Sequence, residues 1–398
     1  MKKSINTFLK HPTKDNANRS ANPAVIRAST ILFNTMQELY QHEKKIKKHQ
    51  KVSHYSYGRY GSSTTIELEN ILKELEQAFH VFLTGTGFGG VALAIMSLCR
   101  PGDEILVSDN VYGPTKEISE KLLKEFNVTA KFYNPDTFED LKSKISKKTK
   151  LILVENPGSN TFEFQDLSKI VNLAKRKKIF TFLDNTWGTP LYLKPLKLGF
   201  DMSFSSATKY FSGHSDAMGG SLAVNKKVFK QVMFFYKLSG YRMSADEAYL
   251  IIRGLRTLDT RLNQHYKNTK QVINFLKKQK KIKEILYPYK TSSKNFKLWK
   301  KYYSGATGLL SIVIKSKKKS SVIKFVNSLE LFGIGYSWGG FESLAILQEL
   351  RSSKKDEYLQ GRKYFRFNKD EHIVRLHIGL EDPKDLINDL RSSLRYIQ

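Results

Sequence analysis

The sequence contains almost no cysteine and no long apolar run, and these two absences narrow the classes of protein to which it can belong. Its 398 residues include a single cysteine, Cys99, so an intramolecular disulfide is impossible. The longest apolar stretch, residues 91–98, is far too short to cross a bilayer. The N-terminus, MKKSINTFLKHPTKD, lacks the apolar segment of a signal peptide. Together these features predict a cytoplasmic protein without a membrane partner.

Acidic residues are also scarce, because 67 lysines and arginines face only 37 aspartates and glutamates, for a net charge of +30. Such a charge can indicate binding to nucleic acid or to a membrane surface. Here, however, the lysines are spread along the whole chain, and no basic motif with interleaved aromatic residues is found. We therefore interpret the charge as a solvated lysine-rich surface that attracts small anions, and predict no nucleic-acid partner.

The length exceeds what one hydrophobic core usually serves, so at least two domains are expected. Residues 1–60 are polar and irregular and predict an extended arm. An amphipathic helix over residues 64–79 follows, in which Thr64 and Glu67 match a capping box. No internal repeat is visible.

Short apolar runs then alternate with helical segments through residues 61–257, which predicts an α/β domain with a mainly parallel sheet. The predicted strands are EILVSD at 104, LILVEN at 151, IFTFLDN at 179, MSFSSATK at 202 and SLAV at 221. Residues 258–398 change in character and predict a smaller α+β domain. Its last helix begins with Asp382 at the N-cap and Pro383 in the first turn.

A glycine-rich turn, TGTGFGG, precedes an apolar helix that starts near residue 87. Glycine lets the backbone approach an anion, and a helix N-terminus offers free N–H groups and a favourable dipole. The pattern is neither a Walker loop nor a clean dinucleotide fingerprint. Tight packing of a helix on a sheet explains the glycines equally well.

Asp184 ends a predicted buried strand, where an unpaired carboxylate would be costly. It could cap the following turn, bind a metal, or pair with the protonated ring nitrogen of pyridoxal phosphate (PLP). No suitably spaced histidine, cysteine or carboxylate accompanies it, so no metal is predicted.

Lys209 follows another predicted strand, inside SFSSATKYFSGHSDAMGG. Its neighbours are small or apolar, and a desolvated lysine has a lowered pKa that suits Schiff-base chemistry. Ser206 and Thr208 offer hydroxyl groups that could bind a phosphate.

A glycine turn, an acidic strand end and Ser-x-Thr-Lys, in that order, resemble the layout of a fold-type I PLP enzyme. SATKYFSGHSDAMGG is similar to the lysine segment of the cysteine and methionine metabolism family of PLP enzymes. The segments YSYGRYG, RGLRTLDTRLNQH, YSWGGFESL and RLHIGLEDPKDL extend the resemblance from about residue 20 to the C-terminus. It implies the fold of PLP-dependent transferases, with a large PLP-binding domain and a smaller C-terminal domain.

The resemblance implies roles for individual residues. Lys209 should carry PLP as a Schiff base, remove the substrate α-proton and help the leaving sulfur depart. Tyr112 should stack on the PLP ring and share in proton transfer, and Asp184 should pair with the ring nitrogen. The other implied PLP-binding residues are Gly87, Phe88, Ser206 and Thr208, together with Tyr57 and Arg59, which should reach the phosphate of a neighbouring subunit. The implied substrate-binding residues are Arg375, for the α-carboxylate, and Tyr336, Ser337 and Trp338.

Two departures from the family pattern are visible. Phe88 stands where relatives often have methionine or a smaller residue, and Asn160-Thr161 stands where many have asparagine-proline. The first leaves a backbone N–H available, and the second puts a role for Asn160 in doubt.

The YSWGGFESL segment resembles the cystathionine β-lyases of this family rather than its γ-lyases and synthases. The implied reaction is β-elimination of L-cystathionine to L-homocysteine, pyruvate and ammonia, a step of methionine biosynthesis. The alternatives are a cystathionine or methionine γ-lyase, a cysteine desulfhydrase, and an alanine racemase side activity. A more distant alternative is a basic nucleic-acid-binding protein on an inactive PLP scaffold. The arm motif implies at least a homodimer, and the family suggests a tetramer.

Overall fold

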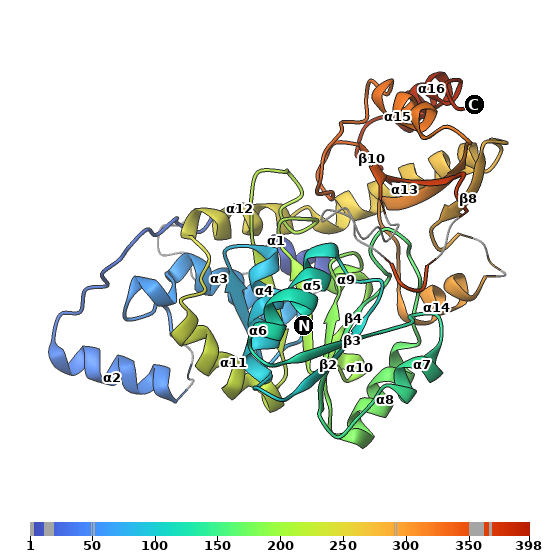
Figure 1. Ribbon diagram of the computed structural model, residues 1–398. Helices are drawn as coiled ribbons and strands as arrows, with labels where there is room; N and C mark the ends of the chain where they lie inside the picture. The colour runs from blue at the N-terminus through green and yellow to red at the C-terminus, as the bar shows by residue number, and fades with distance from the viewer. Residues whose placement is uncertain are drawn as a thin grey trace.

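The protein contains two β-sheets that follow one another along the chain, as the computed structural model shows for residues 4–11, 20–48, 50, 52–289, 291, 293–349, 362–365 and 368–398 (Figure 1). The larger sheet has the strand order β1-β7-β6-β5-β4-β2-β3. Its strands are β1 (His80–Thr84), β2 (Glu104–Ser108), β3 (Thr129–Tyr133), β4 (Thr149–Glu155), β5 (Phe180–Asp184), β6 (Met202–Ser206) and β7 (Gly220–Val224).

Every strand of this sheet except β7 runs in the same direction, because β7 pairs antiparallel with both β1 and β6. Successive side chains of β2 alternate between two cores: Ile105 and Val107 face one, and Leu106 faces the other. Helices α4 (Gly87–Leu98) and α11 (Lys226–Ser239) pack on one face, while α8 (Leu167–Lys177) and α10 (Pro195–Leu198) pack on the other. Burial on both faces explains why the strands read as continuous apolar runs.

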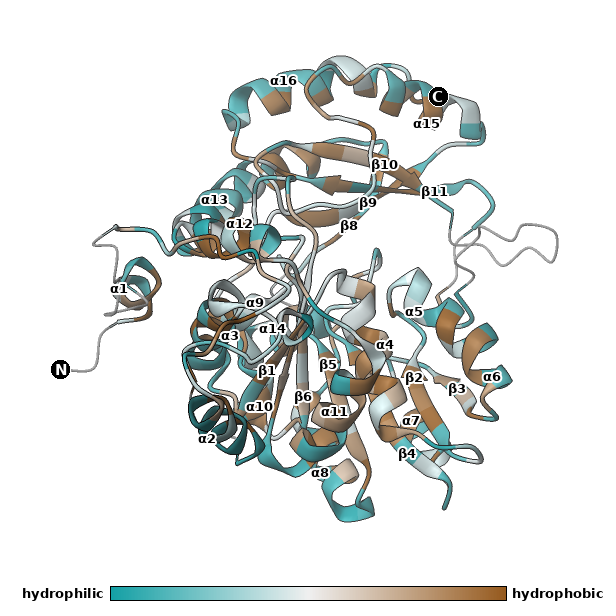
Figure 2. Ribbon diagram, turned by 90° about the vertical axis from the view of Figure 1, so that its left-hand side faces the viewer, coloured by the Kyte–Doolittle hydropathy of each residue, from teal (hydrophilic) through white to brown (hydrophobic). Residues whose placement is uncertain are grey.

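The smaller sheet is antiparallel, with the order β10-β11-β9-β8. It is built from β8 (Ile282–Leu286), β9 (Leu309–Lys315), β10 (Leu344–Gln348) and β11 (Glu371–His377). Figure 2 shows it at the top of the molecule, beneath α15 (Lys319–Asn327) and α16 (Pro383–Leu394). The remaining helices are α1 (Ile5–Lys10), α2 (Met36–Lys47), α3 (Ser63–Glu76), α5 (Gly113–Glu117), α6 (Leu123–Glu125), α7 (Phe138–Ser143), α9 (Thr189–Tyr192), α12 (Ala245–Leu255), α13 (Leu258–Leu276) and α14 (Lys294–Tyr302), with a 3₁₀ turn at Gly58–Tyr60 and a π turn at Ile118–Leu122.

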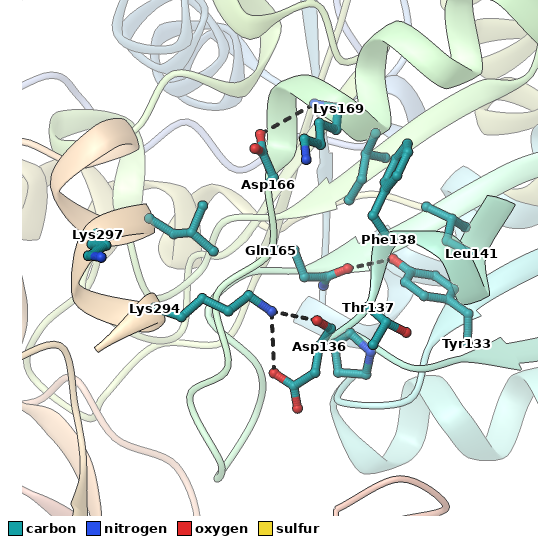
Figure 3. A pocket seen from close by; sticks show the side chains of 13 residues that line it. Tyr133, Asp136, Thr137, Phe138, Leu141, Gln165, Asp166, Lys169, Lys294 and Lys297 are labelled. Atoms are coloured by element: carbon teal, nitrogen blue, oxygen red, sulfur yellow. Dashed lines mark hydrogen bonds and ion pairs between the residues drawn. The ribbon is translucent and has the colours of Figure 1, made fainter. Parts of the chain in front are cut away.

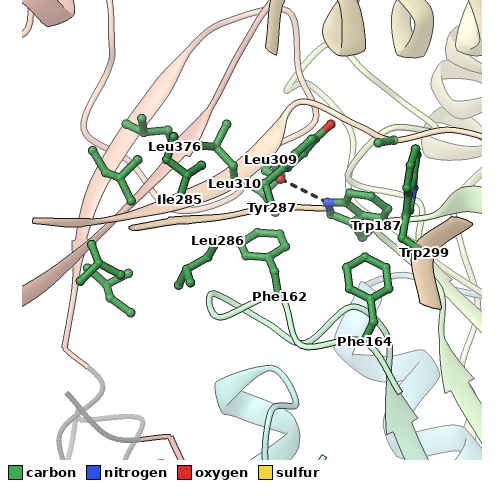
Figure 4. Packing of buried hydrophobic residues seen from close by; sticks show 14 of the residues in the cluster. Phe162, Phe164, Trp187, Ile285, Leu286, Tyr287, Trp299, Leu309, Leu310 and Leu376 are labelled. Atoms are coloured by element: carbon green, nitrogen blue, oxygen red, sulfur yellow. Dashed lines mark hydrogen bonds between the residues drawn. The ribbon is translucent and has the colours of Figure 1, made fainter. Parts of the chain in front are cut away.

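One continuous hydrophobic core joins the two sheets. Phe164 and Trp187 come from the larger sheet's loops and pack beside Tyr287 and Leu309 of the smaller one (Figure 4). The Trp187 indole also donates a hydrogen bond to the Leu309 carbonyl at 3.3 Å. The predicted fold class, a mainly parallel α/β domain followed by a smaller α+β domain, is therefore confirmed. The domain boundaries after residues 60 and 257 stay predictions.

Three local predictions are wrong in detail. The arm over residues 1–60 is not irregular throughout, because it contains α1 and α2; residues 1–3, 12–19, 49 and 51 lie outside the described part. Helix α2 buries none of its residues, and its sequence is dominated by charged and polar side chains, so it was not recognised as a helix of the core. Helix α3 starts after Ser62, whose N–H donates to Thr65 Oγ1 at 2.9 Å, rather than at Thr64. It ends at Glu76, before Phe79.

Within the residues that the structure describes, no helix is long and apolar enough to span a membrane.

Candidate active site

The predicted site residues follow strands that end at the same edge of the larger sheet. Strand β6 leads to Lys209, β5 ends at Asp184, β2 leads to Tyr112, and β1 leads to the N-terminus of α4. Because these strands are mutually parallel, their carboxyl ends share one edge, where open α/β sheets bind ligands. The smaller sheet contributes Arg375 from β11 and Ser337 and Trp338 from the loop before β10.

Lys209 lies in a tight turn directly after β6, in which its N–H donates to the Ser206 carbonyl at 3.1 Å. Its ammonium group donates to Ser337 Oγ at 2.6 Å and lies 5.6 Å from the centre of the Trp338 ring. Burial and then the positive charge of Arg375 lower the pKa of Lys209 to about 8, while Asp184 opposes this. The chain thus provides a lysine that exchanges its proton near neutral pH.

Asp184 is buried and uses one of its two oxygens to hold the next turn. Its Oδ1 accepts from the Thr186 N–H at 2.9 Å and from the Thr186 hydroxyl at 2.5 Å. The turn-capping interpretation is therefore correct for this oxygen, and Oδ2 takes no part in these bonds. Burial raises the pKa of Asp184 to about 6, and Thr186 and Lys209 oppose it.

Glu155 is a site residue that sequence reasoning missed. It ends β4 directly beside Asp184 in the parallel register, and its Oε2 accepts from the Tyr112 N–H at 2.6 Å. Burial, followed by the charge of Asp184, raises the pKa of Glu155 well above its ordinary value. A carboxylate at the end of LILVE, next to a strand that ends in aspartate, is the signal that could have revealed it.

The N-terminus of α4 lies against Ser206. A Cβ atom on Gly87 would meet Ser206 Oγ at 2.4 Å, so only glycine allows this approach. Thr86 caps the helix by accepting the Gly89 N–H at 3.1 Å, whereas the Gly87 and Phe88 N–H groups, in the first turn, have no acceptor within the helix. The Thr208 hydroxyl donates to the Gly219 carbonyl at 3.3 Å and accepts from the Gly219 N–H at 2.9 Å, and its bond to a phosphate stays a prediction.

The substrate-side residues surround Arg375, whose guanidinium donates to the Ser337 carbonyl at 3.0 Å. Burial lowers the pKa of Arg375 to about 10, and the nearby phenols of Tyr112 and Tyr336 oppose this. Ser337 has a left-handed backbone, with φ of 74°, which turns its side chain toward Lys209. Tyr336 is 83% exposed, so within one chain it encloses little of the site.

A small pocket brings three of the predicted residues together: Asp184, Trp338 and Arg375. It is also lined by residues that the sequence did not single out for it, namely Glu155, Pro157, Gly158, Ser159, Asn160, Phe162, Thr186, Trp187 and Leu309. The loop that follows β4 therefore contributes several lining residues, and Asn160 is one of them.

Comparison with known proteins agrees with this geometry. The family model of Cys/Met metabolism PLP-dependent enzymes matches residues 6–395. A cystathionine beta-lyase of Bordetella avium is 35% identical over 98% of this chain and 98% of its own length. An L-alanine/L-glutamate racemase of Wolbachia pipientis is 34% identical over 94% of this chain and 92% of its own.

A solved structure of cystathionine gamma synthase from Xanthomonas oryzae pv. oryzae, in complex with cystathionine, superimposes with a TM-score of 0.88. It is 26% identical and covers 100% of this chain and 99% of its own. The chain belongs to the Cys/Met metabolism PLP-dependent enzyme family. It is therefore a PLP-dependent lyase of that family, acting on amino-acid substrates, and PLP is its cofactor.

The residues at the sheet edge fit the cofactor of this family. Lys209 offers an amine with a lowered pKa, and Asp184 retains an oxygen for a ring nitrogen. The approach of Gly87 to Ser206 forms a cradle at a helix N-terminus, which suits a phosphate. Among the described residues, no group of histidine, cysteine and acidic side chains could hold a metal ion. The individual roles of these residues stay predictions.

Tyr57 and Arg59 lie apart from this group. Arg59 donates to the Lys237 carbonyl on α11 at 3.1 Å and its guanidinium stacks on the Tyr60 ring. Tyr57 is half exposed. No contact found within the described residues joins either one to Lys209 or Asp184, so their predicted role in a neighbouring subunit's site stays a prediction.

A second hollow lies elsewhere, between the loop after β3 and helix α14 (Figure 3). Its lining includes Asp136, Lys169 and Lys294, and the Tyr133 hydroxyl donates to Gln165 across it at 2.9 Å. None of the predicted site residues lines this hollow.

We predict opposite pKa changes for Lys209 in two variants of the cofactor-free protein. Competitive acylation at increasing pH should give half-maximal labelling of Lys209 near pH 8. Arg375→Met removes a like charge and should move this midpoint up, whereas Asp184→Asn removes an opposite charge and should move it down. A midpoint at the ordinary lysine value, or shifts in the same direction, would contradict the described electrostatics.

Proposed function

We propose that the protein is a cystathionine β-lyase that converts L-cystathionine and water to L-homocysteine, pyruvate and ammonia. The observation that carries the proposal is the position of Lys209 Nζ, held between Ser337 Oγ and the Trp338 ring. The tyrosine-serine-tryptophan sequence at this place resembles β-lyases, and relatives that carry that name, such as the Bordetella avium protein, support the assignment.

The chain's own residues would bind and orient the substrate before any bond breaks. When bound, PLP withdraws electrons from the substrate Cα toward its protonated ring nitrogen. Asp184 Oδ2 would hold the proton on that nitrogen, because its Oδ1 is already fixed by Thr186. Arg375 would bind the α-carboxylate through two parallel hydrogen bonds. Tyr112 would cover the cofactor ring.

Lys209 would move the protons of the reaction. Its pKa of about 8 leaves an appreciable neutral fraction, which can remove the α-proton and return a proton to the departing sulfur. A γ-elimination needs a base that also removes a proton from Cβ, and its leaving group lies one carbon farther from Cα. The hydrogen bond to Ser337 and the Trp338 ring fix Nζ at one place, which suits Cα and the sulfur on Cβ.

We further propose that the protein acts as a homodimer or a tetramer in the cytoplasm, with the arm completing a neighbouring site. Helix α2 buries none of its residues, and Leu32 just before it is 88% exposed. Tyr40, on α2, is also exposed. Apolar side chains displayed on a projecting helix support a second copy of the chain as the partner that covers them.

The keto acid formed from L-cystathionine tests the proposal. The PLP-loaded enzyme should release pyruvate and homocysteine in equal amounts, and Lys209→Ala should lower the rate about a thousandfold. A coupled lactate dehydrogenase assay measures the rate of keto-acid release, and chromatography identifies the keto acid and the homocysteine. Release of 2-oxobutyrate and cysteine would instead identify a γ-lyase and overturn the assignment.

A second candidate, alanine racemisation, has independent support. The Wolbachia pipientis relative named a racemase is as similar to this chain as the β-lyases are. Racemisation needs a second proton donor besides Lys209, so that Cα can be reprotonated from the opposite side. Tyr112 suits that task, because burial raises the pKa of its phenol and keeps the proton on it.

We predict that L-alanine is converted to D-alanine, detected with D-amino-acid oxidase, and that Tyr112→Phe suppresses this conversion more than it suppresses pyruvate release from cystathionine. The reason is that β-elimination returns its proton to sulfur through Lys209 and does not need the phenol at Cα. Absence of D-alanine, or an equal loss of both activities in the variant, would rule out this role of Tyr112.

A further inference from the structure

Arg362 is a buried arginine that joins the two domains outside the site described so far. It lies in the segment before β11 and is only 8% exposed. Its guanidinium donates to Asp109 Oδ2 at 3.3 Å, Thr161 Oγ1 at 2.5 Å and Glu163 Oε1 at 3.0 Å. One side chain thus bridges the loop after β2 and the loop after β4.

Asp109 is fully buried and receives four hydrogen bonds. Three of them, from Arg362 and from the Lys363 and Tyr364 N–H groups, reach Oδ2, and Lys116 on α5 reaches Oδ1 at 2.9 Å. The backbone of the segment 362–364 is therefore docked on Asp109 as firmly as the arginine side chain is. Because Asp109 starts the loop that leads to Tyr112, the docking also fixes where that loop begins.

Glu163 makes the second half of the connection. Its Oε2 accepts from the Thr161 hydroxyl at 2.7 Å and from the Asn110 side-chain amide at 3.4 Å. The Ser159 N–H donates to the Asn110 carbonyl at 2.7 Å. The two loops are thus tied to each other as well as to Arg362, and the second loop carries the Ser159 and Asn160 wall of the pocket.

The charges of this cluster balance, which explains why it can be buried. Asp109 and Glu163 face Arg362 and Lys116. Removing one partner of a buried ion pair leaves an uncompensated charge and is strongly destabilising. Arginine suits the centre because its planar group reaches three acceptors at once, which the single ammonium group of lysine cannot do.

One end of the connection leads along the chain to Tyr112 and the other to Arg375; we call the space between these two side chains, where the proposed function places the substrate, the amino-acid slot. Tyr112 follows Asp109 and is held by Glu155, while Arg375 lies on β11, the strand that follows the segment 362–365. The two side chains interact electrostatically, since Tyr112 raises the pKa of Arg375 against the effect of burial. Arg362 is also among the groups that lower the pKa of Glu155 against burial.

We propose that Arg362 is a positioning residue that sets the width of the amino-acid slot by holding the Tyr112 loop and the Arg375 strand at a fixed separation. The inference rests on the roles of Tyr112 and Arg375 in the proposed function. It extends that function, because it assigns the recognition of a carboxylate to a residue that does not touch the substrate.

The test compares two probes that bind the PLP-loaded protein, L-alanine and ethylamine, through the change in cofactor absorbance. Only L-alanine has a carboxylate for Arg375. Arg362→Met and Arg362→Lys should each raise the dissociation constant for L-alanine about tenfold and leave that for ethylamine within about twofold. Equal losses for both probes, or no loss for either, would overturn the proposal.

A charge-matched double variant separates positioning from stability. Arg362→Met/Glu163→Gln removes the uncompensated carboxylate, while Asp109 keeps Lys116 and two backbone donors. Its melting temperature should return to within about 2 °C of the parent protein, but its weak L-alanine binding should persist. Binding that recovers together with the melting temperature would mean that Arg362 is only structural.

Lys363→Ala is the matched control, because it keeps the backbone N–H on Asp109 and removes a neighbouring positive charge; both probes should bind it as they bind the parent. If Arg362→Met does not fold, Arg362→Lys keeps the charge and carries the test alone. The probes bind whether or not cystathionine is cleaved. Absence of pyruvate with an intact probe pattern therefore rejects the proposed reaction but not the positioning role.

Discussion

Desolvation of Lys209 beside Arg375 is the interaction on which the rest of the site depends. Two positive charges in a largely buried place disfavour the protonated amine, and Asp184 only partly offsets them. The same burial acts in the opposite sense on the acidic groups, because it raises the pKa values of Asp184 and Glu155. The fold thereby brings Lys209, Asp184, Glu155 and Arg375 close together. Because burial lowers the pKa of the lysine and raises the pKa values of the two carboxyl groups, these values lie closer to one another than they do in free side chains.

Each of the two sheets contributes different residues to the site. The parallel sheet brings Lys209, Asp184 and Glu155 to one edge through adjacent strands. The antiparallel sheet contributes Arg375 and, through the preceding loop, Ser337 and Trp338. The shared core around Trp187 and the ion pairs of Arg362 hold the sheets together, so the distance between the two halves of the site is set by packing and by buried charge.

The sequence predicted what depends on local pattern. The parallel strands, the last helix and the placement of Lys209 and Asp184 at the ends of strands could be inferred because apolar runs, caps and small-residue frames lie within a few positions of each other. Helix α2 was missed because charged and polar residues dominate its sequence, and the structure shows that it buries none of them. The start of α3 was misplaced because both Ser62 and Thr64 are good N-cap residues, and only the Thr65 contact decides between them.

The missed site residues depend on contacts between distant segments. Glu155 becomes significant only when β4 and β5 are known to be neighbours, and Arg362 only when the loops of Asp109 and Glu163 converge on it. No spacing of residues in the sequence indicates that these distant segments contact one another. Tyr57 and Arg59 illustrate the same limit, since no contact among the described residues joins them to Lys209 and their role in a neighbouring subunit's site stays a prediction.

Burial distinguishes Lys209 from the many other basic residues of a chain with a charge of +30, and we propose that Lys209 is the lysine that bonds to PLP. Borohydride reduction of the PLP-loaded enzyme, followed by peptide mapping, tests it directly. The account predicts that the phosphopyridoxyl group is found on Lys209 in the peptide that follows β6. Stoichiometric labelling of any other lysine would contradict it.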